Sequence, residues 1–217
     1  MATYQSLLPQ ILPEVPGCPQ TIVLQKLADT VRHFCRESWF WQEPIEPVTL
    51  IPFIPLAPDS HQYELATDGN TEVLGVIYLL HKGRTLPSAS VSAMDHCMPG
   101  WREQSAPDPR AWLPVGSNRV MFNPHADTQQ ARAVTGRVAV APAVGALVFG
   151  DPLLTYTDGL VAGTLARLQR MAKSEWAEPQ MSATNQAIYA ESLSLARLEA
   201  MREHHADAPV AHPLLDI

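Results

Sequence analysis

Residues 19–38 read PQTIVLQKLADTVRHFCRES, and this stretch decides how the rest of the chain has to be arranged. Pro19 suits a first helical turn, because its missing N–H would be unpaired there anyway. Apolar side chains then recur at three- and four-residue spacing, namely Leu24, Leu27, Ala28, Val31, Phe34 and Cys35. We therefore predict an amphipathic helix that must bury one face against other elements.

Further helices are predicted on both sides of this one. A short helix over about residues 4–11 stops before Pro13. A second helical block runs over about residues 151–173, and a final helix runs over about residues 182–204. For the final helix, we expect the buried apolar face to consist of Ala187, Ile188, Leu195, Leu198 and Met201.

Residues 48–150 have the character of an antiparallel β region. Pro52 and Pro55 interrupt an apolar run at 48–56, which predicts an edge strand or a linker. Residues 72–86 predict a strand, a turn at Lys82-Gly83 and a return strand. Residues 94–116 are rich in proline and aromatic residues and predict a long loop. We expect four to six short strands.

The predicted fold class is mainly α with a β insertion, an α+β fold. The helices form a small bundle, with an antiparallel β lobe between the second and third helices, a long C-terminal helix and an extended tail. The predicted division is residues 1–47 and 151–207 for the bundle, 48–150 for the β lobe and 208–217 for the tail.

Composition argues against several classes of function. The chain has 217 residues and a net charge of −7, with no basic run longer than two residues, so we do not expect DNA to be the main ligand. The three cysteines form no CxxC pair, which favours a reducing compartment without disulfides. The N-terminal segment lacks the pattern of a signal peptide, and no apolar run is long enough for a membrane span.

Candidate reactive residues are few. Asp95, His96 and Cys97 are adjacent potential metal ligands, but adjacent residues rarely converge on one ion. Cys35 lies on the apolar face of its helix and is expected to be buried, whereas Cys18 is expected to be exposed. No motif of a nucleotide-binding loop, a zinc protease or a serine hydrolase occurs. We therefore expect no catalytic residues, no cofactor and no metal.

Other features point to packing and assembly. Gly159 and Gly163 predict a close approach between helices. Trp39 and Trp41 would face the same side at strand spacing, and the candidates for a subunit interface are Trp39, Trp41, Trp101 and Trp112. The tail is either a fraying terminus or a docking peptide, whose anchors would be Val210, His212, Pro213, Leu214, Leu215 and Ile217.

The opening of the chain resembles the start of head-to-tail adaptor proteins of tailed bacteriophages, also called connector or head-completion proteins. The resemblance is carried by LPEVPGCPQTIVLQKLADTVRHFCRESWFW at residues 12–41. HQYEL, VIYLLHKGRTL, DGLVAGTLARLQRM and AESLSLARLEAM also follow the layout of that family. About thirty residues of this likeness are specific, and they include no catalytic motif.

The resemblance implies a non-enzymatic virion protein, made in the cytoplasm of the bacterial host. Such adaptors assemble as a ring, typically of twelve subunits, beneath the portal protein, and present a surface to the next neck, tail or nozzle protein. Double-stranded DNA would pass through the lumen without specific binding. The C-terminal tail would dock on the portal. Two alternatives stay open: a small metal- or cysteine-dependent hydrolase, and another neck or tail-completion protein.

Overall fold

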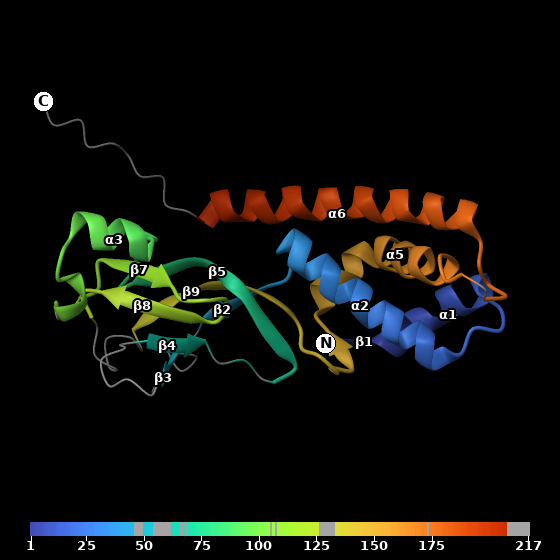
Figure 1. Cartoon of the computed structure of the whole chain (residues 1–217), viewed down its shortest axis with the longest axis horizontal. Coiled ribbons are helices and arrows are strands. Elements are labelled where there is room, and N and C mark those ends of the chain that lie inside the picture. The colour runs from blue at the N-terminus through green and yellow to red at the C-terminus, as the bar shows by residue number, and fades with distance from the viewer. Residues whose placement is uncertain are drawn as a thin grey trace, which may run out of the picture. The chain divides into compact units, whose positions relative to one another are not determined.

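The computed structural model describes residues 1–45, 50–53, 62–65, 67, 69–104, 106, 108–125, 133–172 and 174–207 (Figure 1). They form an α+β fold with antiparallel sheets, which confirms the predicted class. The chain makes two compact units. The first consists of Met1–Glu43, Ala66–Gly75 and Val138–Leu198, and the second of Pro44–Leu65, Val76–Arg137 and Glu199–Ile217. The division predicted from the sequence, with boundaries after residues 47, 150 and 207, stays a prediction.

Helices dominate the first unit. It begins with η1 (Tyr4–Leu7), α1 (Leu8–Ile11) and η2 (Leu12–Glu14) and continues with α2 (Gln20–Ser38). After the β region come η4 (Asp151–Tyr156), α5 (Thr157–Gln169) and α6 (Pro179–Asp207), the last of which extends beyond this unit. All four predicted helical regions are therefore confirmed, and the last is longer than expected.

The helix α2 buries most of the predicted face, whereas Leu24 and Ala28 of that face are only half-buried. Leu27, Val31, Phe34 and Cys35 are fully buried. The helix begins one residue later than expected, because Pro19 is extended and stands before its first residue. It ends where Trp39 adopts the left-handed conformation, with φ of 54°, and donates its backbone N–H to the carbonyl of Cys35. The core of the first unit is built around this helix.

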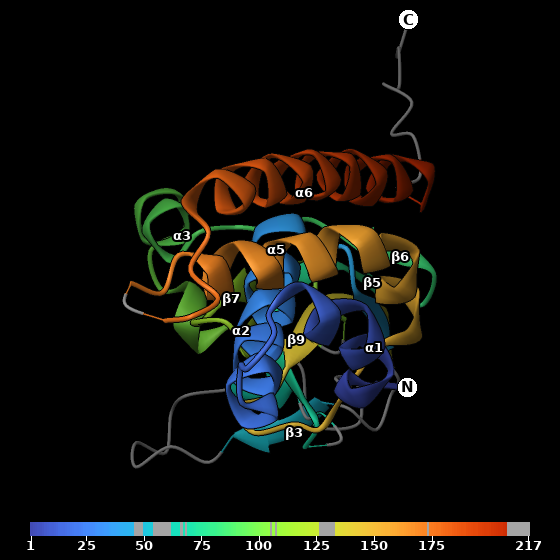
Figure 2. The ribbon, with the colours of Figure 1, turned by 90° about the vertical axis from the view of Figure 1, so that its right-hand side faces the viewer.

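The close helix approach predicted from Gly159 and Gly163 is confirmed. A Cβ atom on Gly159 would lie 2.4 Å from Cβ of Ser192 on α6. A Cβ atom on Gly163 would lie 2.4 Å from the ring of Tyr189 and 2.9 Å from Thr30 on α2. The two glycines therefore let α5 pack closely against both α6 and α2 (Figure 2).

The predicted buried face of α6 is wrong. Ile188, Leu195, Leu198 and Met201 are exposed, by 41%, 54%, 52% and 59%. The side chains turned inward are smaller or polar, namely Ser182, Asn185, Tyr189 and Ala196. The reason is that Gly159 and Gly163 bring α5 close to α6. At most of the inward positions of α6, only a small side chain fits between the two helices. A stripe of leucines would not fit so close an approach.

Three sheets contain the strands of the described residues. The pair β1 (Ala2–Thr3) and β10 (Val148–Phe149) belongs to the first unit. One four-stranded sheet has the order β2 (Gln42–Ile45), β9 (Val134–Pro142), β5 (Thr71–His81) and β6 (Arg84–Leu86). The other has the order β3 (Leu50–Phe53), β4 (Gln62–Leu65), β8 (Arg119–Asn123) and β7 (Ala111–Pro114).

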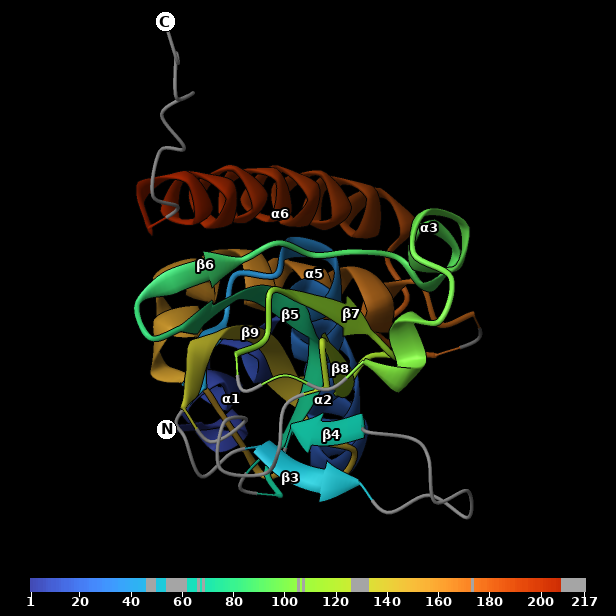
Figure 3. The ribbon, with the colours of Figure 1, turned by 90° about the vertical axis from the view of Figure 1, so that its left-hand side faces the viewer.

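The strand predictions hold in part. β3 is an edge strand, as its proline indicated (Figure 3). The hairpin of β5 and β6 turns at Lys82 and Gly83, whose φ angles of 50° and 78° suit a two-residue turn with both residues left-handed. The expected number of strands was too low, since the described part of residues 48–150 holds eight strands, β3 to β10.

The long loop predicted at residues 94–116 is wrong. This segment contains most of α3 (Val91–Cys97), η3 (Trp101–Glu103) and β7. The Ser90 hydroxyl begins α3 by accepting the backbone N–H of Ala93. Met94, Trp101 and Leu113 then pack into a small core. Burial of these large side chains orders a segment whose composition alone is typical of a loop.

Candidate functional site: two apolar surfaces of the first unit

A row of large apolar side chains runs along the outer side of α6 in the first unit. We call it the outer stripe and define it as Met181, Ile188, Leu195 and Leu198, which are 39–54% exposed. Met181, Ile188 and Leu195 follow one another at seven-residue spacing, so they lie along one side of the helix. The exposed Glu191 lies on the same side, between Ile188 and Leu195, and interrupts the apolar row with a charge. Single exposed apolar residues are ordinary, but several on one side of a helix are typical of an interaction surface.

Hydrogen bonds hold α6 so that this stripe stays outward. Ser182 donates its hydroxyl to the carbonyl of Ala166 on α5 at 2.8 Å. The amide nitrogen of Asn185 donates to Oε1 of Gln169 at 2.9 Å. Both bonds are buried, so turning the helix about its axis would leave polar groups unsatisfied away from water. The register of α6 on α5 is therefore well defined.

Two contacts tie α6 to α2 as well. The hydroxyl of Tyr189 and Nδ1 of His33 share a hydrogen bond at 2.7 Å. Burial raises the pKa of Tyr189 to about 12, and burial, together with Arg167, lowers the pKa of His33. Further along, Nε of Arg197 donates to the carbonyl of Glu37 at 2.6 Å. The outer stripe thus belongs to a helix fixed on two others.

A second apolar surface lies near the start of the chain. We call it the N-terminal groove, a pocket of about 530 Å³ lined by Thr3, Tyr4, Gln5, Leu24, Gln25, Ala28, Gly145, Ala146, Leu147 and Val148. None of these residues is charged. At its edge Leu147 is 81% exposed, and Val144, in the same turn, is 79% exposed. The groove is therefore an apolar surface with a protruding apolar lip.

The two surfaces lie on different sides of the first unit. The chain start and β1 lie on the far side of α5 and α2 from α6 (Figures 1 and 2). The groove includes residues of β1, η1 and α2, whereas the outer stripe belongs to α6 alone. The first unit therefore has two separate apolar surfaces on different sides.

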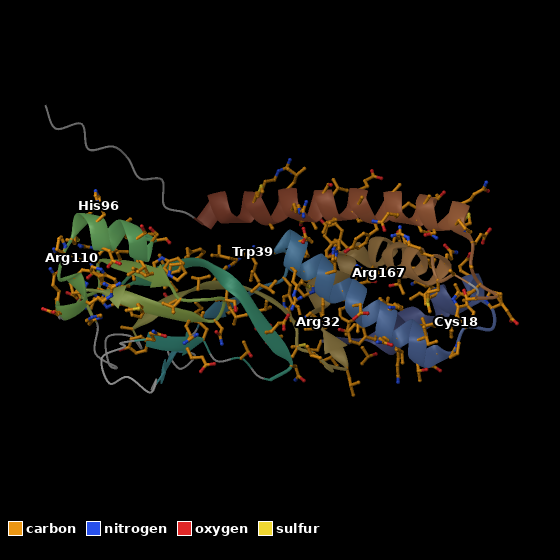
Figure 4. All side chains as sticks on the ribbon, in the orientation of Figure 1. Cys18, Arg32, Trp39, His96, Arg110 and Arg167 are labelled. Carbon is orange, nitrogen blue, oxygen red and sulfur yellow. The ribbon has the colours of Figure 1, made fainter. Side chains whose placement is uncertain are left out.

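The second unit carries a pocket of a different chemical kind. It has a volume of about 620 Å³ and is lined by His81, Lys82, Arg84, Thr85, Leu86, Asp108, Pro109 and Arg110. Lys82 pairs with Asp108 at 2.5 Å, and this hydrogen bond is the main reason why the pKa of Asp108 lies below its usual value. Within the described residues neither Arg84 nor Arg110 forms an ion pair, although the charge of Arg84 also helps to lower the pKa of Asp108. Figure 4 shows where Arg110 lies. The side chains that line the pocket therefore carry a net positive charge, although the chain as a whole is acidic.

Asp95, His96 and Cys97, the residues of the alternative hydrolase hypothesis, do not form a metal or cysteine site within the described residues. Asp95 accepts hydrogen bonds from Nε1 of Trp101 at 2.8 Å and from Arg102, whose bond is the larger cause of its lowered pKa. His96 and Cys97 are exposed, and Figure 4 shows where His96 lies on α3. No group of three or more metal-ligating side chains occurs among the described residues. Consecutive helical residues point in different directions, which keeps these three apart.

The predicted exposure of Cys18 is wrong, because only 8% of the residue is accessible. Cys35 is fully buried as expected, and this burial raises the pKa of its thiol. A buried thiol that is held protonated is a poor nucleophile. Neither cysteine therefore provides a reactive group at the surface.

The tryptophans predicted as interface residues differ in exposure. Trp41, Trp101 and Trp112 are only 3%, 1% and 5% exposed, so their rings pack inside the chain, which argues against them as contacts with another subunit. Trp39 is 38% exposed and stays a candidate. The expectation that Trp39 and Trp41 face the same side rested on extended backbone. The backbone of Trp39 is instead left-handed, so that reasoning does not apply, and the expectation stays a prediction.

The predicted tail anchors Val210, His212, Pro213, Leu214, Leu215 and Ile217 lie outside the described residues. For the outer stripe, periodicity in the sequence identified most of the apolar residues, but they were predicted to lie on the buried side of α6. The groove was missed, since its residues come from three distant segments. The basic pocket was missed for the same reason, because Arg110 is far from the hairpin in sequence.

Neither the scan against protein-family models nor the search of curated proteins finds a match to this chain. Among the residues that the structure describes, no helix has both the length and the apolar character needed to cross a bilayer.

Proposed function

We propose that this protein is a structural virion protein, a head-to-tail adaptor that forms a ring below the portal of a tailed bacteriophage. It extends the DNA channel and joins the head to the tail. The observation that carries the proposal is the outer stripe of α6, an exposed row of large apolar side chains on a firmly held helix. When another subunit covers such a row, apolar surface is removed from water, and this stabilises the complex.

The resemblance of residues 12–41 to phage adaptors supports the same role, and the α+β fold agrees with it. In this proposal the protein functions in the virion neck, and the ring has about twelve subunits, as the resemblance implies. The residues of the tail, above all Leu214, Leu215 and Ile217, dock on the portal. The net charge of −7 favours DNA that slides through the lumen rather than DNA that binds.

The alternative of a hydrolase rests on Asp95, His96 and Cys97. The hydrogen bonds of Asp95 to Trp101 and Arg102 give that carboxylate a role in holding α3 and η3 together. Stoichiometric zinc in the purified protein, or an activity lost on Cys97→Ala, would favour the hydrolase. The other alternative is a different neck or tail-completion protein. Direct binding to the portal distinguishes the adaptor from this alternative.

The direct test mixes the purified protein with its portal and images the complex by negative-stain electron microscopy. We expect a ring of density attached to one end of the portal. A chain ending at Asp207 is expected to keep its circular dichroism spectrum and its melting temperature but to lose portal binding. The full-length variant Leu214→Asp/Leu215→Asp should fail in the same way, since it removes the apolar anchors without shortening the chain.

Two results would count against parts of this proposal. Unchanged portal binding by the chain ending at Asp207 would exclude the tail as the docking element. Failure of the full chain to bind the portal at any concentration would contradict the adaptor role itself. A monomer in the absence of the portal is compatible with the role, because a ring can form on the portal alone.

A further inference from the structure

We infer that the basic pocket of the second unit binds the phosphoryl group of a small phosphomonoester. All the residues that line this pocket lie between Val76 and Arg137, within one compact unit. The inference goes beyond the proposed ring and does not depend on it, since no residue of the outer stripe takes part.

The hairpin of β5 and β6 forms one side of the pocket (Figure 3). His81 and Arg84 are partners across the hairpin, and Lys82 lies in the turn between them. The strand β6 adds Thr85 and Leu86 to the lining. One short hairpin therefore provides two cations, a hydroxyl group and an imidazole ring.

The segment that leads into β7 forms the other side. The backbone N–H of Trp112 donates to the carbonyl of Pro87 at 3.1 Å, and its indole Nε1 donates to the carbonyl of Leu86 at 3.1 Å. The backbone N–H of Arg110 donates to the carbonyl of Asn123 on β8 at 2.8 Å. The backbone that carries the cations is thus fixed by bonds within the protein, so little order has to be gained when a ligand binds.

The charge of the pocket favours an anion. Lys82, Arg84 and Arg110 are cationic, and Asp108 is the one carboxylate among the lining residues. Asp108 pairs with Lys82 at 2.5 Å, whereas the two guanidinium groups form no ion pair within the described residues. An anion bound between these groups offsets the repulsion of like charges in one pocket.

The donors suit a phosphoryl group better than a carboxylate. A guanidinium group binds phosphate oxygens through two parallel hydrogen bonds. A phosphomonoester carries about 1.5 to 2 negative charges at neutral pH and offers three terminal oxygens, enough for Arg84, Arg110 and the hydroxyl of Thr85. A carboxylate has a single charge and fewer oxygens, so it satisfies fewer of these donors.

The size of the pocket indicates a ligand larger than inorganic phosphate. Its volume of about 620 Å³ is typical of sites for small organic molecules. Leu86 and Pro109 are buried and give part of the lining an apolar character. His81 is only 5% exposed, and its Nε2 has no hydrogen-bond partner among the described residues. A buried polar atom without a partner is costly, and in the proposed complex a polar atom of the ligand pairs with it.

The first test titrates the full chain with inorganic phosphate at low salt and follows the backbone amide signals by NMR. We expect saturable shifts at residues 81–86 and 108–110, with one phosphate bound per chain. Sodium chloride at the same ionic strength should not cause these shifts. Glycerol 1-phosphate and AMP should bind at least as tightly as phosphate, whereas acetate and a DNA duplex, counted per phosphate diester, should bind at least about tenfold more weakly.

Charge variants test which residues hold the anion. Arg84→Gln and Arg110→Gln should each weaken phosphate binding at least about tenfold, as expected for the loss of a charge-assisted hydrogen bond. Asp108→Asn should strengthen it, because it removes the carboxylate from the lining. The control Arg170→Gln removes an exposed arginine of the first unit and should leave binding unchanged. All four side chains are exposed, so the melting temperatures should stay close to that of the unchanged chain.

Several results would overturn the inference. One is the absence of shifts at residues 81–86 and 108–110. Another is an equal loss of binding in Arg170→Gln, which would mean that net charge alone attracts the anion. Acetate that binds as tightly as phosphate would contradict the phosphoryl group, and a DNA duplex that binds more tightly than both monoesters would contradict a small ligand. None of these measurements involves the portal, so the inference and the adaptor role can fail separately.

Discussion

Two glycines of α5 decide how the helices of the first unit meet. Gly159 and Gly163 leave no room for a Cβ atom, because Ser192, Tyr189 and Thr30 already occupy that space. A larger residue at either glycine would push α6 or α2 outward. Single hydrogen atoms in place of side chains therefore determine the spacing of three helices, and through it the direction in which the outer stripe faces.

We predict that Gly159→Ala lowers the free energy of unfolding by about 1–3 kcal/mol, because the new methyl group overlaps Ser192. The double variant Gly159→Ala/Ser192→Gly moves the Cβ atom from one helix to the other and should recover most of the loss. Urea unfolding of the four proteins of this cycle gives the coupling between the sites. Additive losses would show that the two residues do not meet.

The carboxylate of Asp95 is a second residue whose effect can be measured. The hydrogen bond from Arg102, and then that from Trp101, favour its charged form and lower its pKa below the ordinary value of 3.8. These bonds therefore contribute stability above the pKa of the unfolded chain, and the contribution is lost as pH falls through the lower folded pKa. This loss of stability affects the contact between α3 and η3, because the carboxylate of Asp95 on α3 bonds to Trp101 on η3.

We expect the indole N–H resonance of Trp101 to shift only below about pH 4, when Asp95 becomes protonated and the hydrogen bond to Nε1 weakens. The control variant Asp95→Asn should abolish this titration and leave the other indole signals unchanged. Both Asp95 and Arg102 are well exposed, so the shift in pKa should shrink in high salt. A transition at or above the ordinary pKa would contradict the assigned hydrogen bonds.

At the scale of elements, α2 and α6 show when a periodic pattern is sufficient to predict which face of a helix is buried. The face of α2 was predicted correctly for Leu27, Val31, Phe34 and Cys35, whereas Leu24 and Ala28 are half-buried and line the groove. In α6 the large apolar residues lie outside, and the inward side consists of small and polar side chains. Periodicity shows that a helix has a distinct face, but the neighbouring helix decides which face is covered. The sequence predicted a close helix approach at the glycines of α5, but it did not indicate that the small residues of α6 would lie against them.

The orientation of α6 can be tested on the isolated, dilute protein. We predict that Leu195→Ala and Ile188→Ala each change the free energy of unfolding by less than about 0.5 kcal/mol, as expected at exposed positions. Ala196→Leu, on the fully buried side, should cost about 1–3 kcal/mol through overpacking. Losses of about 2–5 kcal/mol for the two alanine variants would mean that the stripe is buried after all.

At the scale of the whole molecule, each of the two units contains residues from distant parts of the chain. The strands β5 and β9 both contribute residues to both units, since the divisions fall at Gly75 and Arg137. Helices and hairpins could be predicted because their signals lie within a few residues. The groove and the basic pocket could not, because residues more than twenty positions apart form them only after the chain has folded.

The small side chains between α5 and α6 have a consequence for the energetics of assembly. A contact made by serine, alanine and glycine buries little apolar area, so α6 is held chiefly by its hydrogen bonds and by Tyr189. The free energy of opening α6 locally therefore depends on this small set of specific contacts. A neighbour that covers the outer stripe binds only the closed form and therefore stabilises it. In the proposed ring, local folding of α6 and subunit association would therefore be linked, and each subunit would become more rigid as its neighbour binds.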